Sequence, residues 1–234
     1  MTNDVDEVRS PPTWWARIEF EVLTAGLIVA AGLWGFVELS EIARDSVPHG
    51  LDTSILLAFR EPGQPDNPIG SVRLEATMRD ITALGSAAVL TLVTAVAFFY
   101  LLVARRLTTA LFVLVAVGGG QVLSSLLKLG IDRPRPELVS HLMDETTMSF
   151  PSGHAMMSAV TYLTLGALIT RIMPTAAQRA FVMAIAVLLT VLIGVSRIYL
   201  GVHWPSDVLA GWCAGFAWAM LFWLAARLIA RRRS

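Results

Sequence analysis

Three short polar clusters interrupt an otherwise apolar chain of 234 residues. The first contains the only lysine, Lys128, and reads K-L-G-I-D-R-P-R-P over residues 128–136. The second is P-S-G-H at 151–154, and the third is S-R-I-Y-L-G-V-H-W-P-S-D at 196–207. Charged groups beside a bilayer are unfavourable and usually serve a function. A cation-rich set with two histidines indicates a site that holds a phosphate group and cleaves it.

The third cluster pairs an imidazole with a carboxylate. His203 precedes Asp207 by four residues, with Pro205 between them. Proline suits the first turn of a helix, so we predict a helix that begins near Pro205 and carries Asp207 in its first turn. A carboxylate there can accept one imidazole N–H and leave the other nitrogen free to attack. Taken alone, however, the pair is better explained as an interfacial histidine with a capping aspartate.

The second cluster predicts a helix start. Ser152 is a suitable N-cap, and Gly153 lets a ligand approach the backbone. Free N–H groups at such a start bind anions. His154 then falls in the first turn, where a histidine can act as general acid toward a leaving oxygen.

Basic residues complete the predicted site. Arg135 and Arg197 can each hold a phosphoryl group through two parallel hydrogen bonds, and Lys128 adds a point charge. Arg133 is also followed by proline and could replace Arg135 on local grounds. Phosphoryl transfer needs positioning and charge stabilisation above all, which cations and helix-start amides can supply. We therefore predict no metal and no cofactor.

A metal site is the main alternative. His154, His203 and Asp207 could form a triad of two histidines and one carboxylate. The neighbouring lysine and arginines would repel a divalent cation from the same pocket, so an anion fits this charge set better.

Composition places the clusters in a membrane protein. Hydrophobic residues make up 55% of the chain, charged residues only 15%, and mean hydropathy is +0.64. A soluble domain has about 25% charged residues. Six apolar stretches approach the roughly 20 residues that a membrane-crossing helix needs. They are residues 18–39, 81–104, 107–127, 153–171, 180–196 and 208–227. We predict an all-α fold, a six-transmembrane-helix bundle that forms one membrane-embedded domain over residues 1–234.

The segment 40–80 joins the first two predicted spans. Residues 51–60 and 71–85 resemble short amphipathic helices, separated by the Pro/Gly-rich stretch E-P-G-Q-P-D-N-P-I-G. We predict a short helical cap on the outer interface, with a mobile connector as the equal alternative.

Arginine placement predicts the orientation. Arg105 and Arg106 join the second and third spans, Arg171 and Arg179 flank the turn between the fourth and fifth, and further arginines lie near both termini. If the chain alternates through six spans, all of these fall on one side, which should be cytoplasmic. The three polar clusters then share the outer, periplasmic face of a cell (inner) membrane, and both termini are cytoplasmic.

The three clusters together resemble a known family. They read K-x6-R-P from Lys128, P-S-G-H from Pro151 and S-R-x5-H-x3-D from Ser196, in this order. This set is similar to the type 2 phosphatidic acid phosphatase family, part of the acid phosphatase and vanadium haloperoxidase superfamily. The resemblance implies a metal-independent phosphatase that works through a phosphohistidine intermediate.

The resemblance also implies a role for each residue. His203 is the nucleophile, Asp207 its partner, and His154 the proton donor to the leaving group. The phosphoryl oxygens are held by Lys128, Arg135 and Arg197, together with the Ser152 and Gly153 region.

A site at the mouth of a helix bundle suits a phosphate carried on a lipid. Phosphatidic acid, phosphatidylglycerophosphate, an isoprenyl diphosphate and a lipid A phosphate all fit, and membrane lipids are the expected surroundings. No basic stripe or aromatic platform indicates nucleic acid. Two other classes of protein are alternatives. A haloperoxidase is expected to be soluble, which this apolar chain disfavours. A non-catalytic six-helix transporter-like protein would not need a nucleophile, an acid and an anion clamp on one face.

Overall fold

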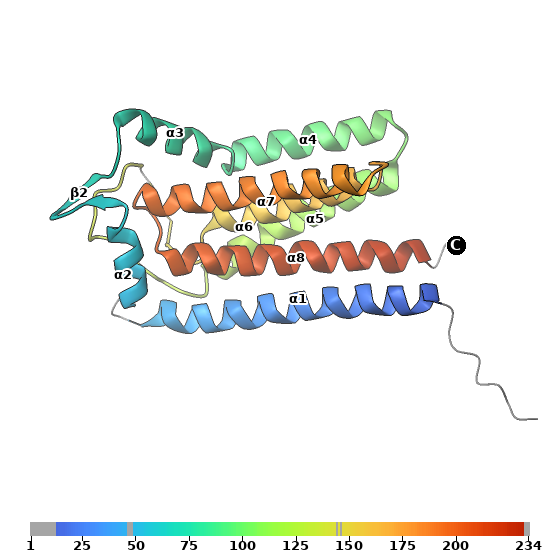
Figure 1. Cartoon of the computed structure of the whole chain (residues 1–234), viewed down its shortest axis with the longest axis horizontal. Coiled ribbons are helices and arrows are strands. Elements are labelled where there is room, and N and C mark those ends of the chain that lie inside the picture. Colours follow the sequence, from blue (N-terminus) through green and yellow to red (C-terminus); the bar gives the residue numbers. More distant parts are fainter. Residues whose placement is uncertain (1–12, 46–48, 144, 146, 232–234) are drawn as a thin grey trace, which may run out of the picture.

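The computed structural model describes residues 13–45, 49–143, 145 and 147–231. Long helices run along the longest axis of the molecule (Figure 1). They are α1 (Thr13–Arg44), α4 (Ala87–Val103), α5 (Leu107–Lys128), α6 (Gly153–Thr170), α7 (Ala176–Tyr199) and α8 (Pro205–Arg231). A cap between α1 and α4 contains α2 (Gly50–Leu57), strands β1 (Arg60–Glu61) and β2 (Gln64–Pro68), and α3 (Val72–Ala83). The two strands pair antiparallel and are the one departure from the predicted all-α fold in the described residues.

The structure supports several membrane spans, but not all six that we predicted. Within the described ranges, four helices are long and apolar enough to cross a membrane: Val22–Arg44, Leu107–Lys128, Ala176–Tyr199 and Pro205–Leu228. Helices α3 and α4, which meet at an angle of 47°, make a fifth if the bent pair is one span. The chain is therefore a multi-pass membrane protein, and the sixth span remains a prediction.

Helix α6 lies inside the bundle and is not among the four candidate spans. It packs against α5, α7 and α8, and most of its 18 residues are buried. The buried set includes Ser158, Thr161 and Thr164, which a lipid-facing helix would disfavour. A helix covered by other helices needs no apolar outer face, so hydropathy underestimates it.

Close contact between α6 and α8 depends on two glycines of α8. A Cβ on Gly211 would lie 2.7 Å from the carbonyl oxygen of Ser152. One on Gly215 would lie 2.6 Å from the carbonyl oxygen of Met156. Small residues at this spacing let two helix backbones approach each other in a membrane.

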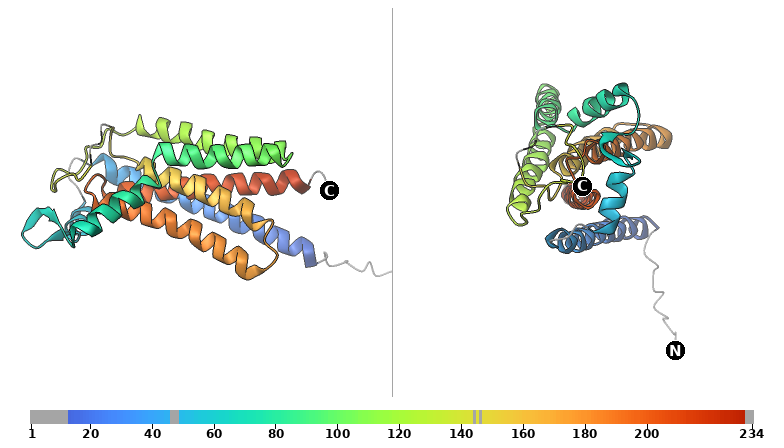
Figure 2. Two further views of the ribbon diagram at one scale, coloured as in Figure 1. Left: turned by 90° about the horizontal axis from the view of Figure 1, so that it is seen from above. Right: turned by 90° about the vertical axis from the view of Figure 1, so that its left-hand side faces the viewer.

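The outer helices present apolar side chains to the surroundings. Helix α1 packs against α8, and large exposed residues such as Leu27 and Trp34 cover its other faces. Viewed from the capped end, α8 lies near the middle of the bundle, with α1 on one side and α4 and α5 on another (Figure 2). Such apolar surface is what lipid chains require of a membrane protein.

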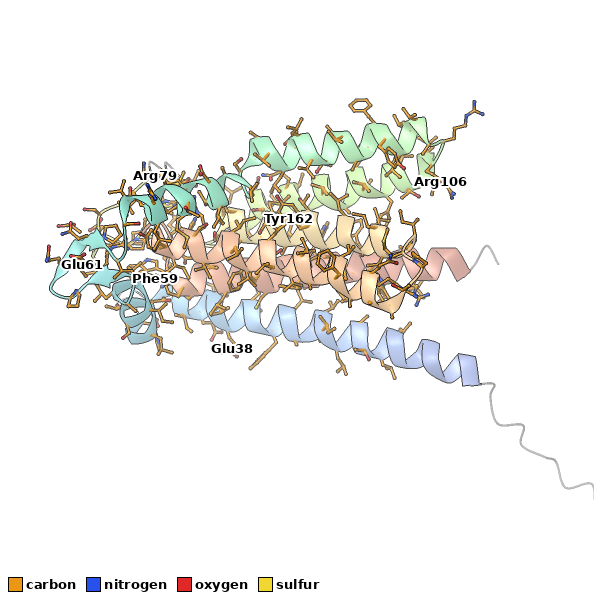
Figure 3. The ribbon with its side chains drawn as sticks, turned by 45° about the horizontal axis from the view of Figure 1, so that its top comes forward. Glu38, Phe59, Glu61, Arg79, Arg106 and Tyr162 are labelled. Atoms are coloured by element: carbon orange, nitrogen blue, oxygen red, sulfur yellow. The ribbon has the colours of Figure 1, made fainter. Side chains whose placement is uncertain are left out.

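The two ends of the bundle differ in character. Phe59, Glu61 and Arg79 lie at the capped end, whereas Arg106 lies at the other (Figure 3). Because α5 ends at the cap and α6 and α8 begin there, the three polar clusters share that end, as predicted. The predicted cytoplasmic arginines at positions 9, 232 and 233 lie outside the described residues.

The cap is packed against the bundle, so the mobile-connector alternative is wrong for its described part. Tyr199 and Val202 are buried against cap residues that include Phe59 and Ile69. The hydroxyl of Tyr199 also donates to the carbonyl of Ile69 at 2.9 Å. The predicted boundaries need correction here: α1 continues to Arg44, and the span predicted from residue 81 begins at Ala87. The reason is that Ser86 caps a new helix, accepting from the amide of Val89 at 3.3 Å.

We expect Gly215→Ala to destabilise the protein. The added Cβ meets backbone and the Cβ of Ala159 at 2.7 Å, neither of which is a flexible side-chain end. Such overpacking lowers the free energy of unfolding by about 1–3 kcal/mol. The check is the thermal unfolding midpoint in detergent. Gly26→Ala is the matched control because nothing lies within 4 Å of its Cβ position. Equal midpoints for both variants would contradict the close contact of α6 with α8.

Candidate active site

The starts of α6 and α8 are joined directly, which brings the second and third clusters together. The amide of Ser152 donates to the carbonyl of Asp207 at 3.0 Å. Lys128, at the end of α5, reaches the same place: a Cβ on Gly153 would lie 3.5 Å from its Cε. Three helix ends and the loops beside them therefore build one site.

His203 and Asp207 form a buried pair. Asp207 lies in the first turn of α8, which begins at Pro205 as predicted. Its Oδ2 is 3.5 Å from Nδ1 of His203 and accepts from the amide of Trp204 at 2.9 Å. Ser149 donates its hydroxyl to the same oxygen and lies 3.3 Å from Nδ1. The carboxylate therefore fixes one edge of the imidazole.

The other edge of His203 faces a cation. Nη1 of Arg135 lies 3.3 Å from Nε2. Because a guanidinium only donates, this geometry assigns a lone pair to Nε2 and the proton to Nδ1. Burial lowers the pKa of His203 to about 4, although the hydrogen bond that its Nδ1–H donates to Asp207 opposes this. His203 is thus neutral near pH 7, with an unprotonated nitrogen directed at the cations.

The three predicted clamp residues lie around one space and share polar partners. Arg135 donates to the carbonyls of Thr147 at 2.9 Å and Val202 at 2.5 Å. Lys128 donates to the hydroxyl of Thr147 at 3.0 Å. Arg197 is fully buried and donates to the hydroxyl of Thr82 at 3.3 Å. Thr147 therefore lies between Lys128 and Arg135 and accepts hydrogen bonds from both of these like charges.

Glu145 occupies this cation cluster. Its carboxylate is hydrogen-bonded to Arg197 and lies 3.6 Å from Nη2 of Arg135. Burial opposes its ionisation, yet the charge and hydrogen bond of Arg197 keep the pKa of Glu145 below its usual value. A carboxylate is held where we predicted an anion to bind.

The two R-P arginines have different places. Arg133 points to the back of the pair: its Nη1 donates to Oδ1 of Asp207 at 2.6 Å. Its Nη2 donates to Asp52 at 2.8 Å, and its guanidinium lies over the ring of Trp204 at 5.5 Å. Arg133 is therefore not part of the clamp, and Arg135 is the arginine that faces His203.

Ser152 has a more limited role than the sequence suggested, because its hydroxyl and its amide are both bonded within the protein. It is fully buried, its hydroxyl caps the amide of Ala155 at 3.5 Å, and its own amide is taken by Asp207. The amides of Gly153 and His154 have no hydrogen-bond acceptor within the described part of the chain. These two N–H groups are the ones that remain for an anion.

A cavity of about 580 Å³ opens beside the cluster. Lys128, Glu145, Gly153 and His154 line its polar end. It continues between α4 and α5 past apolar side chains that include Leu90, Phe98, Phe99 and Leu114. Leu90 and Phe99 are nine positions apart on α4, so this part follows the helix for about 14 Å.

The metal alternative is not supported by the geometry. No group of three His, Cys, Asp or Glu side chains among the described residues could hold a metal ion. Asp207, the carboxylate of the proposed triad, already bonds Arg133 through one oxygen and Ser149 through the other. The triad of His154, His203 and Asp207 would have to break these bonds to form.

Fold and site together define a membrane protein with a buried imidazole–carboxylate pair beside a cluster of cations. Residues 109–230 match the PAP2 superfamily, a range that contains all three clusters. The chain belongs to this superfamily, and the resemblance predicted from the motifs is confirmed.

Individual relatives agree with this placement. The chain is 35% identical to phosphatidylglycerophosphatase B of Bacillus subtilis over 156 residues, which cover 64% of this chain and 73% of the relative. It is 39% identical to undecaprenyl-diphosphatase of Sulfolobus acidocaldarius over 70 residues, 30% of each chain. A crystal structure of a transmembrane PAP2 type phosphatidylglycerolphosphate phosphatase from Bacillus subtilis aligns with a TM-score of 0.78 and 28% identity. That alignment covers 86% of this chain and 96% of the other.

Sequence reasoning missed four residues that the structure places around the pair and the clamp. Ser149, Thr147 and Glu145 fall in the loop before P-S-G-H, where no local pattern distinguished them from other polar residues. Asp52 lies in the cap, far from all three clusters in sequence. For Asp52 and Glu145, the one sequence feature that could have indicated a role in the site was an acidic side chain in a mainly apolar chain.

We expect the two R-P arginines to fail in different ways when replaced by alanine. Arg133→Ala leaves Asp52 and Asp207 buried without their cation and should lower the free energy of unfolding by about 3–5 kcal/mol. Arg135→Ala removes a phosphoryl contact and should reduce kcat/KM by about 10²–10³-fold while the unfolding midpoint stays near that of the wild type. Thermal unfolding and phosphate release on both variants provide the test. A stability loss confined to Arg135→Ala would reverse the assignment.

Proposed function

We propose that this chain is a metal-independent membrane phosphatase that hydrolyses a lipid phosphate monoester or an isoprenyl diphosphate through a phosphohistidine on His203. One observation carries the proposal above others. Nδ1 of His203 is held by Asp207 and Ser149, so Nε2 faces the clamp with its lone pair, 3.3 Å from Arg135. A nucleophile and an anion-binding group are thus adjacent.

The reaction has two steps. Nε2 of His203 attacks phosphorus, the bond from phosphorus to the leaving oxygen breaks, and His154 gives that oxygen a proton. A water molecule then attacks phosphorus and gives a proton to His154. The phosphorus–nitrogen bond breaks, inorganic phosphate leaves, and His203 is neutral again. Asp207 stabilises the positive charge that the imidazole carries between the two steps.

The clamp supplies charge stabilisation in place of a metal. Lys128 lines the polar end of the cavity, and Arg135 and Arg197 lie beside it through their ion pairs with Glu145. The free amides of Gly153 and His154 add two donors. Nε of Arg197 is buried without a hydrogen-bond partner in the described residues, so it is available to a phosphoryl oxygen. To bind both arginines, the phosphoryl group must displace Glu145 from its ion pairs with Arg197 and Arg135.

The cavity supports a lipid substrate. Its polar end holds the phosphoryl group, and its apolar extension between α4 and α5 suits an acyl or isoprenyl chain. The relatives are named for phosphatidylglycerophosphate and undecaprenyl diphosphate, which both join a phosphate group to such chains. Lipids of this class are the proposed substrates. Arg106, at the far end of the bundle (Figure 3), supports an outer, periplasmic site and cytoplasmic termini.

The test of the proposed function is to trap the intermediate. Purified protein in excess chelator is mixed with labelled phosphatidylglycerophosphate and quenched rapidly, and we expect acid-labile, base-stable phosphate on the wild-type chain. His203→Ala should trap none. Asp207→Asn should bind substrate but turn over slowly, because the imidazole loses its oriented partner. Activity that disappears in chelator and returns with zinc or magnesium would overturn the mechanism, as would a labelled His203→Ala chain.

The role of His154 predicts a dependence on the leaving group. A lipid alkoxide is a poor leaving group and needs a proton, whereas p-nitrophenolate needs it less. His154→Ala should therefore reduce hydrolysis of phosphatidic acid by about 10²–10⁴-fold and hydrolysis of p-nitrophenyl phosphate by much less. Turnover of both substrates by one preparation measures this. Equal losses would leave His154 as a phosphate-binding residue only.

A further inference from the structure

We propose that Asp52, in the first turn of α2 in the cap, is a positioning residue for catalysis that keeps Asp207 effective as the partner of His203. The inference rests on the proposed function of His203 and Asp207. It assigns a catalytic purpose to the cap segment, which none of the three sequence clusters includes.

The contacts of Asp52 lead directly to the catalytic carboxylate. Oδ1 of Asp52 accepts from the amide of Ser206 at 2.8 Å, and Oδ2 accepts from its hydroxyl at 2.5 Å. Oδ2 also accepts from Nη2 of Arg133 at 2.8 Å. Nη1 of Arg133 in turn donates to the hydroxyl of Ser206 at 2.7 Å and to Asp207 at 2.6 Å. Asp52 thus holds the residue before Asp207 and the cation beside it.

This network is buried and carries an excess of negative charge. The exposed fraction of the side chain is 4% for Arg133, 4% for Asp52 and 0% for Asp207. One guanidinium is shared between two carboxylates, which leaves one net negative charge behind the imidazole. If Asp52 were neutral, the whole charge of Arg133 would act on Asp207. Asp207 would then stabilise the positive imidazole of the intermediate less well.

Attachment of the cap does not require a charged Asp52. Leu56 of α2 is fully buried in a cluster with Val208 of α8 and Ala155 of α6. Tyr199 bonds the cap as well, through its hydroxyl to Ile69 and through its carbonyl to Arg60. A buried ion pair is weak evidence for stability, because apolar residues of similar size hold elements together as well or better. The position of the charge beside Asp207 is therefore the more informative feature.

The charged groups that face His203 determine how a change at Asp52 is detected. Asp207 from α8 faces Nδ1, and Arg135 from the loop after α5 faces Nε2. Arg197 from α7 and His154 from α6 also act on its charge. Loss of the Asp52 charge makes these surroundings more positive and disfavours the imidazolium. The acidic limb of kcat/KM, which reports the free enzyme, should then move to lower pH.

The experiment compares Asp52→Asn with Asp66→Asn in the full-length protein. Asp66 is a cap carboxylate that also accepts from a serine hydroxyl, that of Ser140 at 2.6 Å, but it lies outside the network. Initial rates with phosphatidylglycerophosphate are measured across pH, beside thermal unfolding. We expect kcat of Asp52→Asn to fall about 10–100-fold, the loss seen when residues that orient metal ligands are replaced, while KM stays within about threefold of the wild-type value. The acidic limb should shift downward. Asp66→Asn should match the wild type in kcat, in KM and in the position of the acidic limb.

The outcomes separate this inference from the proposed function. A folded Asp52→Asn protein with wild-type kcat and pH profile, while His203→Ala is inactive, overturns the role of Asp52 alone. Activity retained by His203→Ala overturns the proposed function itself. If Asp52→Asn does not fold, Asp52→Ser decides, because it also removes the charge and its hydroxyl oxygen can still accept from the amide of Ser206. A folded Asp52→Ser protein should show a lower kcat at unchanged KM, and unchanged kcat would overturn the inference.

Discussion

The arrangement of buried charge around His203 is the constraint on which the rest of this structure depends. Behind the imidazole, Arg133 is shared by Asp52 and Asp207, so negative charge is in excess. In front of it, Arg135 and Arg197 share Glu145, and Lys128 lines the same cavity as that carboxylate, so positive charge is in excess. Isolated charges cannot be buried at a bilayer edge, and each group here has a partner of opposite sign or a hydrogen bond. The imbalance is divided between two sides, and His203, the proposed nucleophile, lies where they meet.

This division explains why the site needs so many elements. The clamp comes from the ends of α5 and α7 and from the loop before α6, whereas the pair comes from the start of α8 and from residue 203 before it. Helix α6 packs against α5, α7 and α8 together, and its close approach to α8 at Gly211 and Gly215 fixes the distance between the second and third clusters. A central helix with small and polar side chains is therefore a requirement of the site.

The sequence predicted the parts of this arrangement that follow from local rules. Pro205 begins α8 and Ser152 caps α6, because proline and serine act on their own helix starts. Contacts such as Arg133 to Asp52, separated by 81 positions, arise only when the cap folds onto the bundle, so no pattern near either residue reveals them. The span count had a related weakness. Hydropathy did not detect the break before Ala87, within the span predicted from residue 81.

The position of Glu145 has a consequence for how any anion binds. Arg197 is fully buried and bonded to this carboxylate, so an incoming ligand exchanges one anion for another and does not fill an empty clamp. The free energy of anion binding is then the difference between two charge-assisted interactions, one with the ligand and one with Glu145, and not the full strength of either. A phosphoryl group brings three oxygens and up to two charges, whereas the carboxylate brings two oxygens and one charge. On the proposed function, the exchange should therefore favour phosphate esters over carboxylates and neutral lipids, so that the cations discriminate between anions before any bond is broken.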